Sequence, residues 1–171
     1  MRATIVFAAL MGCAAAMPAF ADSTSTVYYS NQNWEVRTVT WSDQTQACTA
    51  EVVYDTSTSE KTFSVWKDKH NPTRLQFYSN DWSFGDKDTF ADVGVQIDSN
   101  QAWSMHNADF YKNSVLFDLP ASDASTQFLQ DVSSGQMLNL NDEHGKLVES
   151  YSLNGAQPAL AKLDECRSAL N

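Results

Sequence analysis

The feature that most constrains the fold of this chain is a two-residue alternation of apolar and polar side chains. Trp34–Trp41 (WEVRTVTW) and Cys48–Tyr54 (CTAEVVY) both place apolar residues at every second position. Successive side chains of a β-strand point to opposite faces, so this period indicates two strands, each with one apolar face. The polar segment SDQTQA between them favours a turn, and the pair is predicted to form an antiparallel hairpin. Cys48 lies on the apolar face of the second strand.

Further short segments have the β-branched and aromatic content of strands and are bounded by Asn, Asp, Ser, Gly or Pro. They are Thr62–Trp66, Arg74–Ser79, Val93–Ile97, Ala102–Met105 and Ser114–Leu119. Two alternating runs around Asn141–Gly145 indicate another hairpin, in which Gly145 suits the left-handed backbone position of the loop. This spacing of short strands is typical of an antiparallel β fold.

Two segments are predicted to be helical. In PASDASTQFLQDVSSG, Ser122 is a candidate N-cap and Gly135 follows the last turn. In AQPALAKLDECRSAL, Pro158 fits the first turn, and Cys166 shares the apolar face. We therefore expect a mainly β fold, a single antiparallel β-sandwich or half-barrel of about eight to ten strands with two short helices. Its inner face is predicted to hold Trp34, Val36, Val52, Phe63, Val65, Leu75, Phe77, Val95, Ile97, Phe117, Leu138 and Leu153.

The first 21 residues have the layout of a cleavable export signal. A single cation at Arg2 precedes the apolar stretch Ala3–Ala16, and the small-x-small pattern Ala19–Ala21 precedes Asp22. The apolar stretch is short for a transmembrane helix, which needs about 20 residues. We therefore predict cleavage after Ala21.

Two alternatives to this cleavage remain open. The segment Leu10–Cys13 resembles a lipoprotein cleavage box, which would attach lipid to Cys13, and the signal could also stay in place as an anchor. With cleavage after Ala21, residues 22–171 form a single β-rich domain. We expect this domain to be periplasmic or secreted, without stable membrane insertion.

Two cysteines survive the predicted cleavage, Cys48 and Cys166. An exported chain reaches an oxidising compartment, where a disulfide is the usual state of such a pair. We predict a Cys48–Cys166 disulfide that ties the final helix to the early hairpin. The alternatives are two unpaired buried thiols, or a zinc site, although neither cysteine has a second Cys or His at ligand spacing.

The charge of the chain excludes some classes of partner. Loss of Arg2 with the signal changes the formal net charge from −10 to −11. A nucleic-acid partner requires a basic face, and anionic lipid attracts basic segments, so we expect neither partner.

No motif in the sequence identifies a reaction or a cofactor. His70, His106 and His144 are scattered, and the chain has no G-x-S-x-G elbow, P-loop or dinucleotide fingerprint. Catalytic residues converge in space rather than in sequence, so a hidden site remains an alternative. We expect a protein that is not an enzyme and that has no catalytic residues, no metal ligands and no cofactor.

One acidic and aromatic segment is the candidate site. Asn80–Asp92 (NDWSFGDKDTFAD) interleaves carboxylates with three aromatic rings. Charged groups beside aromatic rings are typical of recognition surfaces, and we predict that a partner-binding loop is formed by Trp82, Phe84, Asp86 and Asp88. The alternatives are a calcium loop, although the spacing matches no EF-hand, and a loop whose rings complete the core.

A second segment, NLNDEHG (Asn139–Gly145), also superficially resembles a calcium loop. Its glycine falls one place late, and no bidentate Glu follows at the required distance. A hairpin turn is the preferred interpretation. The Trp and Tyr residues also raise the possibility of sugar stacking, but most of them occupy alternating strand positions, which favours core or cross-strand packing.

The second half of the chain resembles the invasion-associated locus B family, which consists of exported bacterial β-rich proteins. The resemblance rests on VQIDSNQAW, SVLFDLPASDASTQFLQDVSSGQMLNL and DEHGKLVESYSLNGAQPALAKL, which occur in the family's order. The family's cysteine pair before the short helix is missing, because Asn113–Val115 stands there, and its early FGDW segment is reduced to Asn33–Trp34. The resemblance implies an extracytoplasmic, non-enzymatic accessory protein, and it supplies no catalytic residues.

These observations lead to one functional expectation and one alternative. The protein is expected to be an exported accessory protein that binds a protein or an envelope component. The alternative is a periplasmic hydrolase whose site is not visible as a motif. A His joined to a Ser, Cys or carboxylate in a deep cleft would favour the hydrolase.

The export signal leads to a direct prediction about the mature protein. Protein isolated from its native compartment should begin at Asp22, because signal peptidase cuts after the small residue of the Ala19–Ala21 pattern. Intact-mass measurement tests this start. A diacylglyceryl increment on Cys13 would instead establish a lipoprotein.

Overall fold

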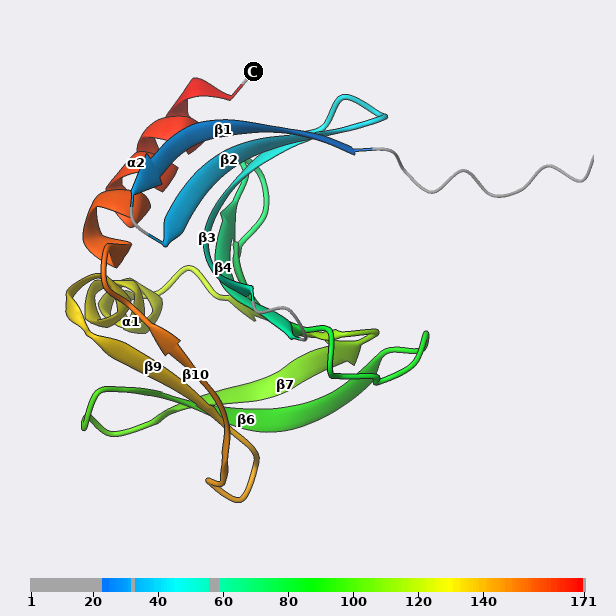
Figure 1. Cartoon of the computed structure of the whole chain (residues 1–171), viewed down its shortest axis with the longest axis vertical. Coiled ribbons are helices and arrows are strands. Elements are labelled where there is room, and N and C mark those ends of the chain that lie inside the picture. Colours follow the sequence, from blue (N-terminus) through cyan, green and yellow to red (C-terminus); the bar gives the residue numbers. More distant parts are fainter. Residues whose placement is uncertain (1–22, 32, 56–58, 171) are drawn as a thin grey trace, which may run out of the picture.

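The computed structural model describes residues 23–31, 33–55 and 59–170, so the predicted signal and Cys13 lie outside the described residues. Figure 1 shows the described strands and helices in one curved arrangement. The strands are β1 (Ser23–Asn31), β2 (Trp34–Trp41), β3 (Gln46–Asp55), β4 (Glu60–Lys67), β5 (Thr73–Ser79), β6 (Thr89–Ile97), β7 (Trp103–Tyr111), β8 (Ser114–Leu119), β9 (Met137–Asn141) and β10 (Leu147–Ser152). The helices are α1 (Asp123–Ser134) and α2 (Ala156–Ala169).

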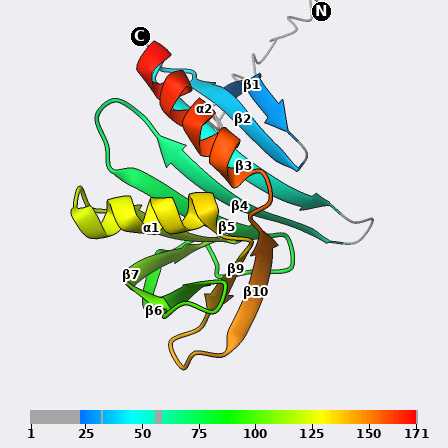
Figure 2. The same cartoon turned by 90° about the vertical axis from the view of Figure 1, so that its left-hand side faces the viewer.

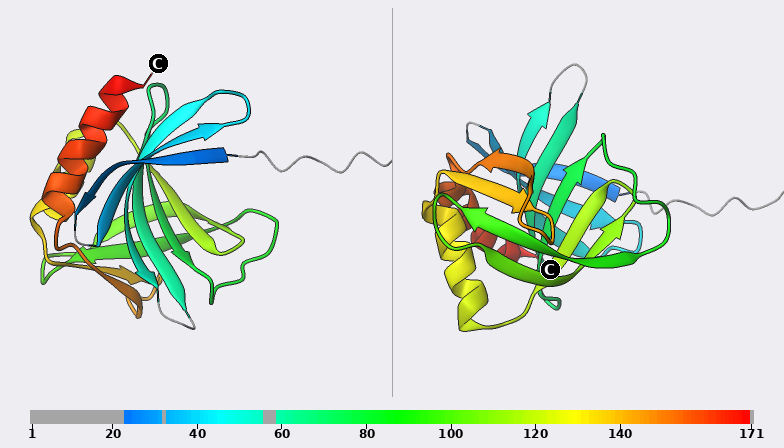
Figure 3. Two further views of the ribbon diagram at one scale, coloured as in Figure 1. Left: turned by 45° about the horizontal axis from the view of Figure 1, so that its top comes forward. Right: turned by 90° about the horizontal axis from the view of Figure 1, so that it is seen from below.

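These strands pair into one antiparallel sheet of 10 strands, in the order β1-β2-β3-β4-β5-β8-β7-β6-β9-β10. The mainly β fold with two short helices is therefore confirmed. Both helices, with β9 and β10, lie on one side of the strands β2–β5 (Figures 1 and 2), and two further views agree on the placement of the helices (Figure 3). The opposite face of β2–β5 carries neither helix.

The core fills the space between the helices and the sheet. All twelve residues predicted for the inner face are buried except Phe117, which is half-buried against the same core. Tyr151 of β10 contacts the rings of Phe63 and Phe77, at centroid distances of 6.0 and 5.8 Å. These contacts join the last strand to the middle of the sheet, because the sheet curls around the core.

Helix α1 has the ends that its sequence predicts. The Ser122 side chain accepts a hydrogen bond from the backbone N–H of Ser125, and Gly135 follows the last turn. A Cβ atom at Gly135 would lie 2.5 Å from Ile97 Cγ2, so only glycine allows the helix end to approach β6 this closely. Phe128 and Val132 are buried, and the ring of Phe128 packs edge-on against Trp103 at 5.7 Å.

The structure corrects three details of the sequence interpretation. The polar segment at the start of the mature chain, which was not predicted to be a strand, forms β1. Its strand conformation comes from pairing with β2 and not from the composition of Ser23–Asn31. The segment expected to be a loop, Asn80–Asp92, ends at Asp88 because β6 begins at Thr89. Helical spacing predicts that Ala124 shares the apolar stripe of α1 with Phe128 and Val132, but Ala124 is exposed.

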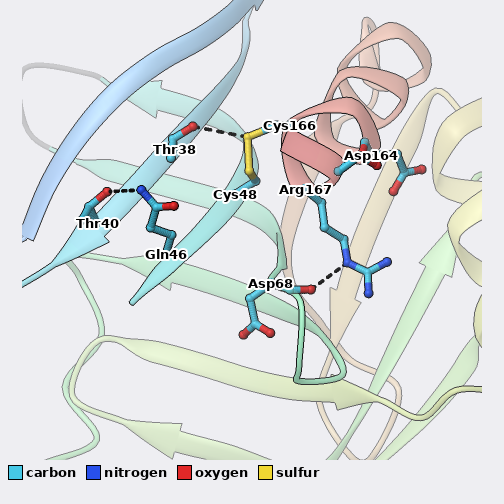
Figure 4. The surroundings of a disulfide bond; sticks show 9 residues. Thr38, Thr40, Gln46, Cys48, Asp68, Asp164, Cys166 and Arg167 are labelled. Atoms are coloured by element: carbon cyan, nitrogen blue, oxygen red, sulfur yellow. Dashed lines mark hydrogen bonds between the residues drawn. A yellow bond between two sulfur atoms is a disulfide. The ribbon is translucent and has the colours of Figure 1, made fainter. Parts of the chain in front are cut away.

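Helix α2 covers the early strands and is bonded to them. The predicted disulfide Cys48–Cys166 is present, with the two Cα atoms 6.1 Å apart (Figure 4). Thr38 Oγ1 of β2 lies 3.4 Å from Cys166 Sγ. The buried face of α2 consists of Ala156, Ala159, Leu160, Leu163 and Cys166. The apolar stripe and the sulfur bridge therefore act on the same side of the helix.

The disulfide is consistent with an oxidising, extracytoplasmic environment. Neither α1 nor α2 combines the length and the apolar composition that a membrane-spanning helix requires.

Reduction of the disulfide should lower the stability of the mature protein. The bridge joins residues separated by 118 positions, and the chain-entropy model gives a loss of about 4–5 kcal/mol for a loop of this size. We expect a lower midpoint of thermal unfolding for reduced protein and for a Cys48→Ala/Cys166→Ala variant. Two alkylatable thiols in denatured, unreduced protein would contradict the bridge.

Candidate binding site

The face of the sheet that points away from the helices, which we call the open face, carries polar and aromatic side chains. Its positions alternate with the core positions, as the strand period requires. One row crosses five paired strands and another crosses seven. The first row is Arg37, Thr49, Trp66, Arg74 and Asp118. The second row is Glu35, Glu51, Ser64, Gln76, Leu116, Asp109 and Phe90.

The open face is hollowed at one end by a pocket of about 430 Å³. We call it the tryptophan pocket, because Trp41 and Trp66 line it with their ring centroids 6.4 Å apart and their planes tilted by 31°. The polar residues that line it include Asp68, Asn71, Arg74, Gln76 and Asp118. Aromatic walls with a few oriented polar groups are the usual composition of a ligand site.

Hydrogen bonds hold the polar groups of this pocket in fixed orientations. Arg74 donates to both oxygens of Asp118, at 2.6 and 2.9 Å. Gln76 Nε2 donates to Ser114 Oγ at 3.0 Å. The two side chains of the Arg74–Asp118 pair are each about half exposed, so their free donors and acceptors can reach a bound molecule.

The rim of the pocket is the loop between β4 and β5, and Asp68 organises it. The Asp68 carboxylate accepts hydrogen bonds from the N–H groups of His70 and Asn71 and from the Asn71 side chain. Desolvation opposes these bonds, but their sum lowers the pKa of Asp68. The charged carboxylate therefore accepts all three of these hydrogen bonds near neutral pH.

Helix α2 fixes the position of the same loop. Arg167 Nε donates to the backbone oxygen of Asp68 at 2.6 Å (Figure 4), and Lys67 pairs with Asp164 at 2.6 Å. Arg167 follows Cys166 directly in the chain. The disulfide that holds the helix to β3 thus also positions the rim of the tryptophan pocket.

In the same row as Trp66, Arg37 pairs with Glu35 and with Glu51, whose Oε1 lies 2.9 Å from Arg37 Nε. Burial raises the pKa of Glu51, and the charge of Arg37 opposes that rise. Asp109 is in a similar position, because burial and the charge of Asp88 raise its pKa while Arg74 lowers it. The carboxylates of Glu51 and Asp109 on the open face are therefore partly desolvated.

The predicted loop residues fall into two groups. Trp82 and Phe84 are half-buried and pack together at 5.7 Å, and Phe84 contacts Phe110 at 5.0 Å. Asp86 and Asp88 are exposed. Phe84 N–H donates to Lys112 O, so the loop is anchored to the turn between β7 and β8. The role of the loop in binding stays a prediction, while its rings also extend the core.

The tryptophan pocket was not predicted from the sequence, although a signal for it was present. Trp41 and Trp66 lie on the polar faces of β2 and β4, whereas Val36 and Val65 of the same strands lie on the apolar faces. An aromatic ring among the polar positions of a strand indicates that the face away from the core also binds or packs against something. The alternation alone had suggested that strand tryptophans pack in the core or across strands.

One histidine meets a carboxylate. His106 Nδ1 lies 2.8 Å from Asp92 Oδ2, and Asp92 also accepts the N–H of Asn107. The His106 side chain is 71% exposed. Among the described residues Asp92 is its hydrogen-bond partner, and no Ser or Cys hydroxyl or thiol bonds to it. The pair stabilises the bulge where the register of β6 and β7 shifts.

In the part of the chain that the structure describes, no group of three or more His, Cys, Asp or Glu side chains is arranged to hold a metal ion. The second calcium-like segment forms the predicted hairpin. Asp142 Oδ1 accepts the N–H groups of His144 and Lys146, and Gly145 has a φ of 79°.

The chain matches no family model, no curated protein and no solved structure in the comparisons. The resemblance to the invasion-associated locus B family therefore stays a prediction.

Arg37 should matter more at neutral pH than in acid. In an Arg37→Met variant the folded-state pKa of Glu51 rises further, because the opposing positive charge is gone. A carboxyl whose pKa is raised by folding loses stability as the pH rises through that pKa. We expect a loss of about 1–2 kcal/mol at about pH 7 that shrinks toward about pH 3, where the carboxyl is protonated in both states.

Urea unfolding at the two pH values measures this difference. Lys162→Met is the matched control, because Lys162 and its partner Glu165 are both exposed and make a surface pair worth less than about 1 kcal/mol. An equal loss for Arg37→Met at both pH values would show that the charge of Glu51 is not involved.

Proposed function

We propose that this protein is an exported accessory protein of the periplasm or cell surface that binds an envelope component or a protein. The observation that carries the proposal is the tryptophan pocket on the open face. The predicted export signal and the disulfide support the location, and the resemblance to the invasion-associated locus B family supports an accessory role.

The pocket is suited to binding because it offers a large contact area at low entropic cost. The rings of Trp41 and Trp66 already pack against each other, so little side-chain freedom is lost when a ligand stacks on them. The Arg74–Asp118 pair presents planar polar groups beside the rings. A ligand with an apolar or planar surface and several hydrogen-bonding groups fits this combination.

A hydrolase is the second candidate, and the His106–Asp92 pair is the observation that favours it. An oriented histidine can act as a general base. Such a base needs a nucleophile or a bound water in a site that excludes bulk solvent, whereas Asp92 and His106 are both largely exposed. Turnover of an ester, glycoside or peptide that is lost in His106→Ala would favour this candidate over binding alone.

The pocket and the loop give separable predictions for binding. Loss of one central tryptophan costs about 2 kcal/mol, or about 30-fold in affinity. We expect a Trp41→Ala/Trp66→Ala variant to lose retention on envelope material from the source cell. The measurement is retention on three immobilised fractions: peptidoglycan, outer-membrane vesicles and soluble envelope proteins.

The matched comparison is a Trp82→Ala/Phe84→Ala variant, which removes the rings of the predicted loop. Thermal unfolding of both variants verifies that they remain folded. Loss of retention in the loop variant alone would assign binding to Trp82, Phe84, Asp86 and Asp88 instead of the pocket. Equal retention of wild type and both variants would contradict both surfaces.

A further inference from the structure

A second pocket lies on the open face next to the tryptophan pocket. It has a volume of about 420 Å³, and Arg74, Leu116 and Asp118 line both pockets. Strand pairing separates Trp66 in the first pocket from Asp109 in the second by three strand spacings, about 14 Å. The two pockets therefore form one elongated site that crosses β4, β5, β8 and β7.

The second pocket contains a carboxylate that lacks a partner. Asp109 Oδ1 is buried, and no described residue donates a hydrogen bond to it. Arg74, which also lines this pocket, is paired with Asp118. His106 is another lining residue, and its Nδ1 lies 2.8 Å from Asp92. A buried carboxylate oxygen without a hydrogen bond is costly, so a cation that enters this pocket supplies the partner that Asp109 lacks.

The tryptophan pocket repeats this arrangement of charge. Its lysine, Lys67, pairs with Asp164 at 2.6 Å, and Arg74 pairs with Asp118. Asp68 lines the same pocket and takes part in no ion pair among the described residues, and the hydrogen bonds that lower its pKa keep it charged. Each pocket thus holds one carboxylate that has no ion-pair partner.

Aromatic rings accompany both of these carboxylates. Trp66 Nε1 donates to Ser64 Oγ at 3.2 Å, which holds the indole along β4, and Trp41 packs beside it. Phe90 lines the second pocket and is 64% exposed. The faces of such rings attract cations, and their surfaces pack against methylene groups. Leu116 adds an apolar surface that both pockets share.

These features favour a linear ligand that carries a cation toward each end and an apolar chain between them. An ammonium group has three donors and no acceptor, so it matches a carboxylate with unused acceptor positions. Methylene groups need no hydrogen-bond partner where they cross Leu116, whereas the amide groups of a peptide would need one. Loss of Arg2 changes the formal net charge from −10 to −11, which attracts cationic ligands and repels anionic ones.

We propose that the two pockets together bind a linear polyamine, with one ammonium group at Asp109 and another beside Asp68 and the tryptophan rings. The Arg74–Asp118 pair lies between these two positions, and its two charges neutralise each other. A polyamine is a second kind of ligand for the open face, and its binding does not require that of an envelope component or a protein.

The test is calorimetric titration of the mature, oxidised protein with spermine, a linear tetra-amine. Wild type should bind one molecule per chain. Asp109→Asn removes a charge with little change of shape, and Trp66→Ala removes a ring, so each should raise the dissociation constant about tenfold. The matched control is Glu143→Gln, which removes one negative charge at a 59% exposed position in the turn between β9 and β10. It should change the dissociation constant by less than about twofold, because distant exposed charges are screened.

The indole N–H resonances give an independent measurement. Spermine should shift the resonance of Trp66 and leave that of Trp34, which is buried in the core, unchanged. Thermal unfolding verifies that the variants remain folded. Absence of spermine binding, or an unshifted Trp66 resonance at saturation, would overturn the proposal. Equal weakening by Asp109→Asn and Glu143→Gln, or full affinity in Trp66→Ala, would overturn it as well.

Retention on the envelope fractions is measured separately, so the two proposals can fail independently. Intact retention without spermine binding would refute the polyamine site alone. Spermine binding without retention of wild type would refute the proposed function alone.

Discussion

The Cys48–Cys166 bridge is the constraint on which the rest of the structure depends. A helix as short as α2 is marginal on its own, because nucleation costs more than its few hydrogen bonds return. The bridge and the buried stripe around Leu163 hold it against β2 and β3. Without this helix the apolar faces of those strands would be open to water. The next residue, Arg167, transmits the same constraint to the loop at Asp68.

The core and the tryptophan pocket lie on opposite faces of the same strands. Val65 and Leu75 pack in the core, while Trp66 and Arg74 on the same two strands reach the open face. The positions of the side chains on one face are therefore set by packing on the other. A rigid sheet gives the tryptophan pocket its shape before any ligand binds, which lowers the entropic cost of binding.

The open face is not an ordinary solvated surface, although neither helix covers it. Thr49 and Ser64 are buried at its centre, and burial raises the pKa of both Glu51 and Asp109. Neighbouring side chains on the curved sheet keep water away from these groups. Electrostatic contacts are stronger where water is scarce, so a ligand that offers cationic or hydrogen-bonding groups would gain more here than on an exposed loop.

The sequence by itself determined both helices and most of the strands, because each depends on a local pattern, and it determined the disulfide because only two cysteines follow the predicted signal. Alternation identified the strand of Val36, the pattern around Ser122 and Gly135 marked the ends of α1, and an exported pair of cysteines predicted the bridge. Strand β1 was missed, since its order comes from pairing with β2 and not from its own composition.

Only the tertiary structure decided which distant residues meet. The pairing of β5 with β8 places Arg74 beside Asp118, although 44 positions separate them in the chain. Trp41 and Trp66 come together because β2, β3 and β4 are neighbours and twist over one another. A period of two fixes the face on which a side chain lies, but register and curvature fix its neighbours. For that reason the candidate pocket could not be derived from the sequence alone.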